Sequence, residues 1–518
     1  MIFLATAHAV EMRGVTKTFG AVVANSKVDL DIRQGEILSL LGENGSGKTT
    51  LMNMLSGIYF PDEGQIFVEG KPVTIRSPKD AFDLGIGMIH QHFKLVDVLT
   101  ATENILLGLQ EKGALNLKSA AEKIRRICDK YGFVVDPNKK IYDMSVSEKQ
   151  TVEIVKVLYR GANILILDEP TAVLTPQETR KLFNVMRNMK EDGKSIIIIT
   201  HKLHEVMEIS NRVAVLRKGE YVGDVATCDT NPQKLTDMMV GHAVTLNIDR
   251  PDPVNLVKRL DVQNLTVKNV YGLKALDNVS FQAYGGEILG IAGISGCGQK
   301  ELLEAIAGLQ VTEQGSSVRY FPGETSDCTE LVGMNPLDIK KAGVSFSFVP
   351  EDRLGMGLVG SMGMTGNMML RSYRSGKGMF TDRKSPKKLA ENIKEQLEVV
   401  TPDVNTPVRR LSGGNVQKVL VGREIAAEPK VLMTAYAVRG LDINTSYTIY
   451  NLLTEQKMQG VAVVYVGEDL DVLLELCDRI LVLCGGKVNG IVDARTTTKE
   501  EVGLLMTNLR EEAKEERQ

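Results

Sequence analysis

The chain has 518 residues, which exceeds what one hydrophobic core usually supports and indicates at least two domains. Hydrophobic residues make up 43% and charged residues 25%, and the net charge of −3 excludes a strongly basic nucleic-acid-binding protein. No stretch approaches the roughly 18 uninterrupted apolar residues that a membrane-spanning helix needs. The first ten residues are apolar but lack a preceding Lys or Arg, so we expect a lead into a first strand and no signal peptide.

The sequence contains the same pattern twice. GEILSLLGENGSGKTTLMNMLSGI, which begins at Gly35, matches GEILGIAGISGCGQKELLEAIAGL, which begins at Gly286, at an offset of 251 residues. Further along, MSVSEKQ from Met144 matches LSGGNVQ from Leu411 at an offset of 267. A period of about half the chain indicates a duplicated domain. We expect the 16 extra residues of the second copy to lie within 312–363.

Each copy begins with a strand, a glycine-rich turn and a helix, and continues with a polar helical stretch and further apolar runs. Short apolar runs bounded by turn signals, such as Ile164–Leu167, are typical of buried parallel strands. The segment 101–160 predicts a helical subdomain inserted into an α/β core. Two prolines in NIDRPDPVNL mark the join between the copies. We therefore predict a first domain over 8–245, a linker over 246–258, a second domain over 259–508 and a charged tail over 509–518.

A phosphate-binding loop is predicted at GENGSGKT, between the apolar run 37–41 and an amphipathic segment. Glycines let successive backbone N–H groups curl around a phosphate, and the following helix presents its positive end. Lys48 is expected to reach the β- and γ-phosphates, and Thr49 to bind Mg²⁺. The predicted nucleotide-binding residues of this loop are Gly42, Glu43, Asn44, Gly45, Ser46, Gly47, Lys48, Thr49 and Thr50.

An acidic pair, Asp168 and Glu169, follows the apolar run 164–167. Carboxylates at the end of a buried strand are costly unless they serve a cation or a proton. We expect Asp168 to hold Mg²⁺ through water and Glu169 to orient or deprotonate an attacking water.

The second copy keeps the loop glycines Gly293 and Gly298 but lacks the chemistry of the first. A neutral amide stands at the lysine position and an ammonium at the hydroxyl position, so neither the γ-phosphate nor Mg²⁺ finds its usual partner. The acidic pair is replaced as well. The substituted positions are Gln299, Lys300, Ala435 and Tyr436.

These motifs resemble those of the ATP-binding cassette (ABC) proteins, over nearly the whole chain. The resemblance implies two tandem α/β P-loop NTPase domains, each with a RecA-like parallel-sheet core, an inserted helical subdomain and an antiparallel β subdomain. It implies ATP and Mg²⁺ as ligands. It also implies that Phe19 stacks on adenine, that Gln91 contacts Mg²⁺ and senses a membrane partner, and that His201 contacts the γ-phosphate. At the matching positions the second copy has Tyr271, Glu351 and Glu468.

The signature motif of ABC proteins is intact only in the second copy, as Ser412, Gly413, Gly414 and Gln417. The first copy keeps Ser145 and has lost both glycines. In this family two cassettes pack head to tail, and each nucleotide lies between one P-loop and the other copy's signature. The resemblance therefore implies one working site, which pairs the first P-loop with the second signature, and one degenerate site.

Among ABC proteins, a fused pair with a degenerate second half is similar to the energy-coupling ATPase of importers for nucleosides and monosaccharides. The segments 85–108, 152–178 and 349–359 favour the nucleoside branch. The resemblance implies two integral-membrane permease subunits, contacted through the helical subdomains and the glutamine loops, a solute-binding lipoprotein, no nucleic acid, and a peripheral position on the cytoplasmic face of the cell membrane.

Three alternatives remain open at this point. One is the ATPase of a ribose, galactose or xylose importer. Another is a twin-cassette translation or DNA-repair factor, which the short linker and acidic charge disfavour. The last is a non-hydrolysing scaffold, which Glu169 and His201 disfavour.

Overall fold

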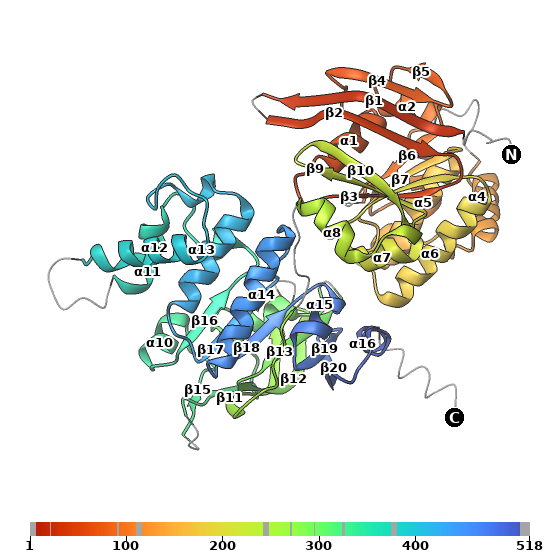
Figure 1. Cartoon of the computed structure of the whole chain (residues 1–518). Coiled ribbons are helices and arrows are strands. Elements are labelled where there is room, and N and C mark those ends of the chain that lie inside the picture. Colours follow the sequence, from red (N-terminus) through yellow and green to blue (C-terminus); the bar gives the residue numbers. More distant parts are fainter. Residues whose placement is uncertain are drawn as a thin grey trace, which may run out of the picture. The chain divides into compact units, whose positions relative to one another are not determined.

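The computed structural model describes residues 7–20, 22–90, 93–109, 116–172, 174–241, 248–269, 272–294, 296–323, 327–373 and 381–507. The chain divides into two compact units, Met1–Thr245 and Leu246–Gln518 (Figure 1). In the described ranges, no helix combines the length and the apolar character needed to cross a bilayer.

The first unit is built on two sheets. A six-stranded sheet has the spatial order β6 (Ile86–Ile89), β7 (Ile164–Asp168), β8 (Ser195–Ile199), β3 (Ile37–Leu41), β9 (Arg212–Arg217) and β10 (Glu220–Ala226). All neighbours in it are parallel except β9 and β10. An antiparallel sheet has the order β2 (Val22–Arg33), β1 (His8–Phe19), β4 (Glu63–Val68) and β5 (Lys71–Val73).

Both faces of the six-stranded sheet are covered, which explains why its strands are continuous apolar runs. Alternate residues of one strand enter different cores: Ile166 packs with the antiparallel sheet and α1, whereas Leu165 and Leu167 pack with the helices on the other face. The helices of the first unit are α1 (Lys48–Leu55), α2 (Pro78–Asp83), α3 (Ala101–Leu106), α4 (Leu117–Tyr131), α5 (Val146–Tyr159), α6 (Pro176–Glu191), α7 (Leu203–Ile209) and α8 (Pro232–Val240), with 3₁₀ turns η1 (Ile141–Asp143) and η2 (Thr227–Asp229).

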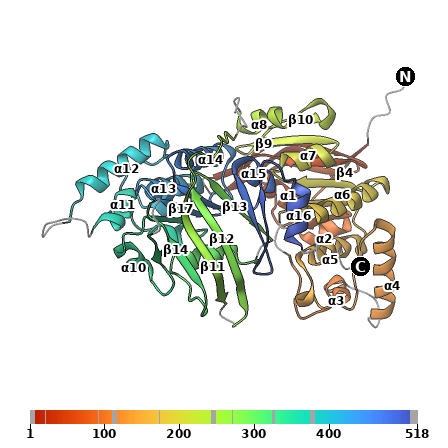
Figure 2. The same cartoon turned by 90° about the horizontal axis from the view of Figure 1, so that it is seen from below.

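The second unit repeats this topology. Its six-stranded sheet has the order β16 (Phe346–Val349), β17 (Val431–Ala435), β18 (Ala462–Val466), β13 (Ile288–Gly293), β19 (Arg479–Cys484) and β20 (Lys487–Asp493). Figure 2 shows β11, β12 and β14 of its antiparallel sheet side by side. That sheet has the order β12 (Lys274–Gly285), β11 (Val257–Lys268), β14 (Ser317–Tyr320) and β15 (Thr329–Glu330).

The helices of the second unit follow in the same sequence as those of the first. They are α9 (Gln299–Ile306), α10 (Pro336–Lys341), α11 (Met364–Ser372), α12 (Lys384–Gln396), α13 (Gly413–Ile425), α14 (Ile443–Met458), α15 (Leu470–Leu476) and α16 (Lys499–Met506), with a π-helical turn η3 (Arg353–Gly357) and a 3₁₀ turn η4 (Val408–Arg410). The α/β fold class, with a helical and an antiparallel subdomain in each copy, is confirmed.

The extra residues of the second copy are spread more widely than expected. Corresponding N-cap residues differ by 251 at Gly47 and Gly298, and by 263 at Thr100 and Gly363. The difference reaches its full value of 267 at the next pair, Ser145 and Ser412. The last four extra residues therefore lie after Gly363, beyond the expected range, because the connection inside the helical subdomain is also longer.

Part of the stretch expected to be a linker packs on the second unit. Ile248 is buried in its core, and Arg250 donates from Nη1 to the carbonyls of Leu474 at 2.7 Å and Cys477 at 2.8 Å. The predicted tail, 509–518, lies outside the described residues.

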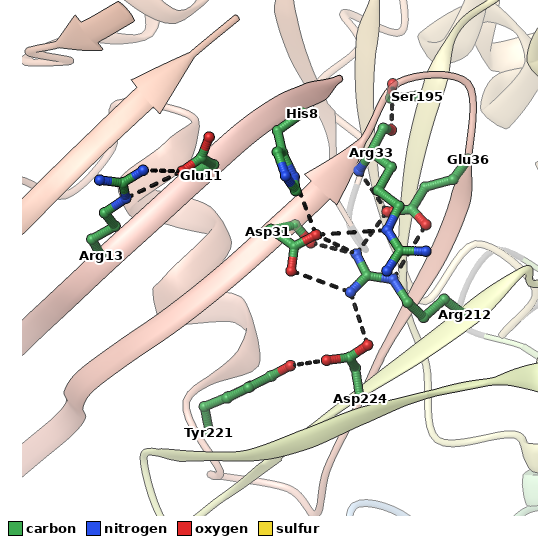
Figure 3. Close-up of polar contacts among 10 residues, drawn as sticks. All are labelled: His8, Glu11, Arg13, Asp31, Arg33, Glu36, Ser195, Arg212, Tyr221 and Asp224. Carbon is green, nitrogen blue, oxygen red and sulfur yellow. Dashed lines mark hydrogen bonds and ion pairs between the residues drawn. The ribbon is translucent and has the colours of Figure 1, made fainter. Parts of the chain in front are cut away.

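A buried arginine joins the two sheets of the first unit (Figure 3). The guanidinium of Arg212, on β9, pairs with Glu36 at 2.9 Å, Asp31 at 3.0 Å and Asp224 at 2.9 Å. Because Asp31 lies on β2 and Glu36 directly precedes β3, this cluster fixes the base of the strand that leads into the glycine loop. In the second unit, Arg479 and Glu287 make the matching pair at 2.7 Å.

Candidate functional site

The glycine loop of the first unit runs from the end of β3 to the start of α1. A methyl group at Gly42 would lie 2.3 Å from the carbonyl oxygen of Leu216, and one at Gly47 2.4 Å from that of Ala24. Gly47 also has a φ of 94°, which favours glycine. At Gly45 no atom lies within 4 Å of such a methyl group, so the loop is packed on one side and open on the other. Of the other residues predicted for this loop, Glu43, Asn44 and Ser46 lie in the turn, and Thr49 and Thr50 lie in the first turn of α1.

Lys48 folds back into its own loop. Its Nζ donates to the carbonyls of Gly42 at 2.7 Å and Glu43 at 2.9 Å. Burial lowers the pKa of the Lys48 ammonium, against the attraction of Glu169 and Asp168. Lys48 therefore places a partly desolvated positive charge between the loop and the acidic pair, in a position to bind a phosphate.

The acidic pair and Thr49 form a set of oxygen atoms suited to a hard cation. The hydroxyl of Thr49 donates to Oδ2 of Asp168 at 3.4 Å. Burial and the neighbouring Glu169 raise the pKa of Asp168 to about 6, although Thr49 and Lys48 lower it. In the described part of the chain, no cluster of three His, Cys, Asp or Glu side chains suits a metal. The oxygens fit Mg²⁺ only when phosphate and water complete its shell.

A left-handed backbone conformation sets the direction of the Glu169 side chain. Its φ is 47°, and its N–H donates to the carbonyl of Ile199, at the end of β8, at 2.8 Å. Its Oε1 lies 3.0 Å from Nδ1 of His201, and this hydrogen bond lowers the pKa of Glu169. A carboxylate kept ionised and hydrogen-bonded to a half-exposed histidine is placed to orient or deprotonate a water molecule.

Phe19 lies at the end of β1 and is 44% exposed. It packs edge-on against Tyr59, with ring centroids 5.2 Å apart, and Nζ of Lys17 lies 5.6 Å from its centroid. An exposed ring with a cation beside it suits stacking on a nucleobase. Two of the residues predicted for nucleotide or metal contact, Gln91 and Tyr271, lie outside the described residues.

The second unit keeps the loop without its charge. Gln299 is buried and its Nε2 donates to the carbonyl of Ile294 at 3.1 Å, so the amide folds back as Lys48 does. A methyl group at Gly293 would lie 2.5 Å from that Nε2. Lys300 is exposed, with its Nζ 3.8 Å from Glu304 on its own helix. Gly298 has a φ of 99°, close to that of its counterpart in the first unit.

An arginine that sequence reasoning missed ties the rest of the degenerate site together. Arg439 pairs with Glu351 at 2.6 Å and with Glu468 at 3.1 Å, and its Cζ lies 5.9 Å from the ring centroid of Tyr436. Ala435 is buried beneath. Burial and the two glutamates raise the pKa of Tyr436 to about 12, so its hydroxyl stays neutral. A fixed cation therefore bridges the positions that match Gln91 and His201. The sequence did offer one signal for this arrangement, since two acidic residues, Glu351 and Glu468, stand at motif positions where the first copy has none.

The two signature segments differ at the N-terminus of their helices. Ser412 caps α13, and its Oγ accepts from Nδ2 of Asn415 at 2.8 Å. Ser145 caps α5 in a capping box, in which the carboxylate of Glu148 accepts from the N–H of Ser145 at 2.7 Å. The same carboxylate pairs with Nζ of Lys139 at 2.7 Å, so an ion pair already occupies this helix end in the first copy. Gln417 of the intact signature is buried.

Comparison with known proteins identifies the family. The family model described as ABC transporter matches residues 25–172 and 276–434. The chain belongs to the ABC transporter family.

Three curated relatives match nearly end to end. The nucleoside import ATP-binding protein NupA of Lactococcus lactis is 41% identical over 97% of this chain and 99% of its own. The guanosine import ATP-binding protein NupO of Bacillus subtilis is 41% identical over 96% and 97%. The glucose import ATP-binding protein TsgD13 of Haloferax volcanii is 38% identical over 96% and 95%. A solved ATP-binding cassette of an ABC transporter, in its ADP conformation, is 23% identical with a TM-score of 0.41 and covers 46% of this chain and 100% of its own.

Proposed function

We propose that the chain is the ATP-hydrolysing, energy-coupling subunit of an ABC importer for nucleosides. The observation that carries the proposal is that five side chains come together in the first unit: Lys48, Thr49, Asp168, Glu169 and His201. In the second unit the matching region holds Arg439, which is paired with Glu351 and Glu468. Only the first set has the groups that ATP hydrolysis needs: a cation for the phosphates, oxygens for a metal, and a base for water.

Each residue of the working site has a distinct role in this proposal. Lys48 and the N–H groups of the loop bind the β- and γ-phosphates, and Phe19 stacks on the base. Thr49 and Asp168, with Gln91, would hold Mg²⁺, which supplies positive charge to the phosphates. Glu169 accepts the proton of the attacking water, and His201 holds that carboxylate in position and contacts the γ-phosphate.

The intact signature completes the working site in this proposal. Ser412 and the N–H groups of Gly413 and Gly414 stand at the positive end of a 13-residue helix, a place where phosphate binds well. The two cassettes pair head to tail, so that this helix end covers the γ-phosphate held by the first loop. The second loop and the first signature then share a site that does not hydrolyse ATP.

The working site drives transport through partners. Closure on ATP and reopening after hydrolysis are passed through the helical subdomains to two membrane permeases, at the cytoplasmic face of the membrane. A solute-binding lipoprotein delivers the solute. Nucleosides are favoured as solute because the relatives named for nucleoside or guanosine import are 41% identical, against 38% for the one named for glucose import.

A pair of matched variants tests the catalytic assignment. We expect Glu169→Gln to abolish phosphate release while the protein retains bound ATP, because the loop and metal ligands remain. Tyr436→Phe changes the equivalent position of the second unit, and we expect it to leave turnover nearly unchanged. Loss of phosphate release in Tyr436→Phe together with activity in Glu169→Gln would show that the two sites are assigned the wrong way round.

Uptake assays test the solute. Cells that carry the chain with its permeases should take up radiolabelled nucleosides, and this uptake should stop in Glu169→Gln. Uptake of ribose or glucose in place of nucleosides would reassign the importer to the monosaccharide class.

A further inference from the structure

The two loops that carry Glu169 and His201 are joined by a polar network just beyond these side chains. Nζ of Lys202, the residue after His201, donates to the carbonyl of Thr171 at 3.0 Å. Thr171 stands two residues after Glu169, and its hydroxyl donates to the carboxylate of Glu205. Nζ of Lys202 also pairs with Glu205 at 3.2 Å, so the three residues form a closed network.

Each member of this network is held by the fold. Thr171 is buried, in the turn that follows β7. Lys202 is the N-cap residue of α7, and its N–H donates to Oγ1 of Thr200 at 3.1 Å. Glu205 lies in the first turn of the same helix. The network therefore joins the turn after β7 to the start of α7.

These contacts complete a pair of links between the two loops. At the base, the N–H of Glu169 donates to the carbonyl of Ile199 at 2.8 Å. Beyond it, Lys202 reaches Thr171. The hydrogen bond from Glu169 to His201, at 3.0 Å, comes between these links along both loops. A side-chain pair keeps its geometry only when the segments that carry it are fixed, so the outer link matters as well as the base.

The second unit keeps the base link but has no counterpart of the network's residues. The N–H of Tyr436 donates to the carbonyl of Val466 at 3.0 Å. At the offset of 267 that relates α7 to α15, the positions of Thr171, Lys202 and Glu205 are occupied by Val438, Asp469 and Val472. The valine side chains make no hydrogen bonds, and the carboxylate of Asp469 accepts from an N–H of its own helix at 2.9 Å. The network therefore accompanies the carboxylate and the histidine in the first unit.

We propose that Lys202 is a positioning residue for ATP hydrolysis: by holding the turn after Glu169, it keeps that carboxylate at hydrogen-bonding distance from His201. The inference rests on the proposed function, in which Glu169 accepts the proton of the attacking water. Lys202 acts through Glu169 and not on the nucleotide, so its loss slows hydrolysis without weakening ATP binding.

The test measures turnover and nucleotide affinity of the full chain side by side. Lys202→Met keeps the length of the side chain and removes its ammonium. We expect the turnover number for phosphate release to fall about tenfold, because general-base catalysis contributes about a hundredfold or more and depends on the placement of the base. The affinity for MgATP should stay within about twofold, since the lost interaction acts only on the chemical step. Lys202→Arg keeps the charge and the donors and should recover most of the turnover.

Lys340→Met is the matched control. Nζ of Lys340 also donates to a backbone carbonyl at 3.0 Å, that of Arg371, but in the second unit. Its loss should change neither turnover nor MgATP affinity. Thermal unfolding of each variant shows that the chain stays folded.

The outcomes separate this inference from the proposed function. If Glu169→Gln abolishes phosphate release and Lys202→Met does not lower it, Lys202 is wrongly assigned and the proposed function stands. An equal loss of turnover and MgATP affinity in Lys202→Met, or no recovery in Lys202→Arg, would also overturn the assignment, since a purely structural role gives that result. If Glu169→Gln still releases phosphate, the proposed function fails, and this inference fails with it.

Discussion

The residue at the end of the central strand has the same backbone in both cassettes but different chemistry. Glu169 has a φ of 47° and Tyr436 one of 50°, a left-handed conformation that costs a non-glycine residue about 1 kcal/mol or more. Each donates its N–H to the last residue of the adjacent strand. The conformation directs the side chain out of the sheet in both units. Only in the first does it deliver a carboxylate to a histidine.

Gly42 and Gly293 provide a matched test of loop packing. We expect Gly42→Ala to weaken ATP binding and turnover at least about tenfold, because its methyl group would lie 2.3 Å from a backbone carbonyl that cannot move without the strand. In Gly293→Ala the methyl group would lie 2.5 Å from Nε2 of Gln299 and 2.9 Å from the carbonyl oxygen of Leu483, so the second loop is disturbed as well. Turnover should nevertheless stay nearly unchanged, because in the proposed assignment the second site does not hydrolyse ATP. Equilibrium binding and phosphate release measure both. Equal losses in the two variants would contradict the asymmetry of the sites.

Asp168 provides a test of the metal. In the unmodified chain, removal of Mg²⁺ by EDTA should weaken ATP binding. Asp168→Asn keeps the shape of the side chain and removes the anionic ligand, so we expect its ATP affinity to be lower and nearly the same with Mg²⁺ and with EDTA. Titration with a fluorescent ATP analogue measures this. A Mg²⁺ dependence that persists in Asp168→Asn would show that the cation is held elsewhere.

At the scale of elements, buried ion pairs connect strands that the hydrophobic core alone would leave free to shift. Arg212 on β9 is 4% exposed and contacts carboxylates of three separate segments (Figure 3). Removing one partner of such a cluster leaves charge uncompensated in a poorly solvated place. The cluster is therefore important for the position of β3 and of the loop that follows it.

Asp224 gives this cluster a predictable pH dependence. Burial raises its pKa, but hydrogen bonds from Tyr221 and Arg212 outweigh burial and hold the pKa below its ordinary value. A lowered pKa stabilises the fold above about pH 4 and loses that contribution as the pH falls through the native pKa. We expect Asp224→Asn to lower the free energy of unfolding by about 1–2 kcal/mol at pH 7.

The difference between Asp224→Asn and the unmodified chain should shrink as the pH falls below about 4. Chemical denaturation at a series of pH values measures it. Asp229→Asn, which changes an exposed carboxylate nearby in sequence, is the control and should have little effect at any pH. A difference that grows at acid pH would mean that Asp224 is not stabilised as an anion.

At the scale of the whole molecule, the two units keep one strand order while their sites diverge. The two copies share the sheet because every central strand is buried on both faces, so its residues must stay apolar. A loop at the carboxyl ends of the strands can change its polar residues without loss of packing. The second unit has other residues at the positions that match Lys48, Asp168, Glu169 and His201, and Arg439 joins two of its substituted residues, Glu351 and Glu468.

Repair of the second loop alone should not restore activity there. We expect the double variant Gln299→Lys and Lys300→Thr to bind additional nucleotide at most, with the turnover number unchanged, since Ala435 and Tyr436 supply no carboxylate for metal or water. In a Glu169→Gln background the double variant should release no phosphate. Measurable phosphate release in that background would show that the second unit retains a base that we have not identified.

The sequence by itself determined the duplication and the positions of the central strands, and it supplied the candidate residues of the first site. The apolar run 37–41 coincides with β3, because a strand buried on both faces must be apolar throughout. The glycines, Lys48 and the acidic pair were predictable because phosphate and metal chemistry allows few residue types at that spacing. Only the tertiary structure decided that Arg439 bridges Glu351 and Glu468. These three residues come from loops after three different strands, and side chains so far apart in sequence meet only when the parallel strands align their carboxyl ends.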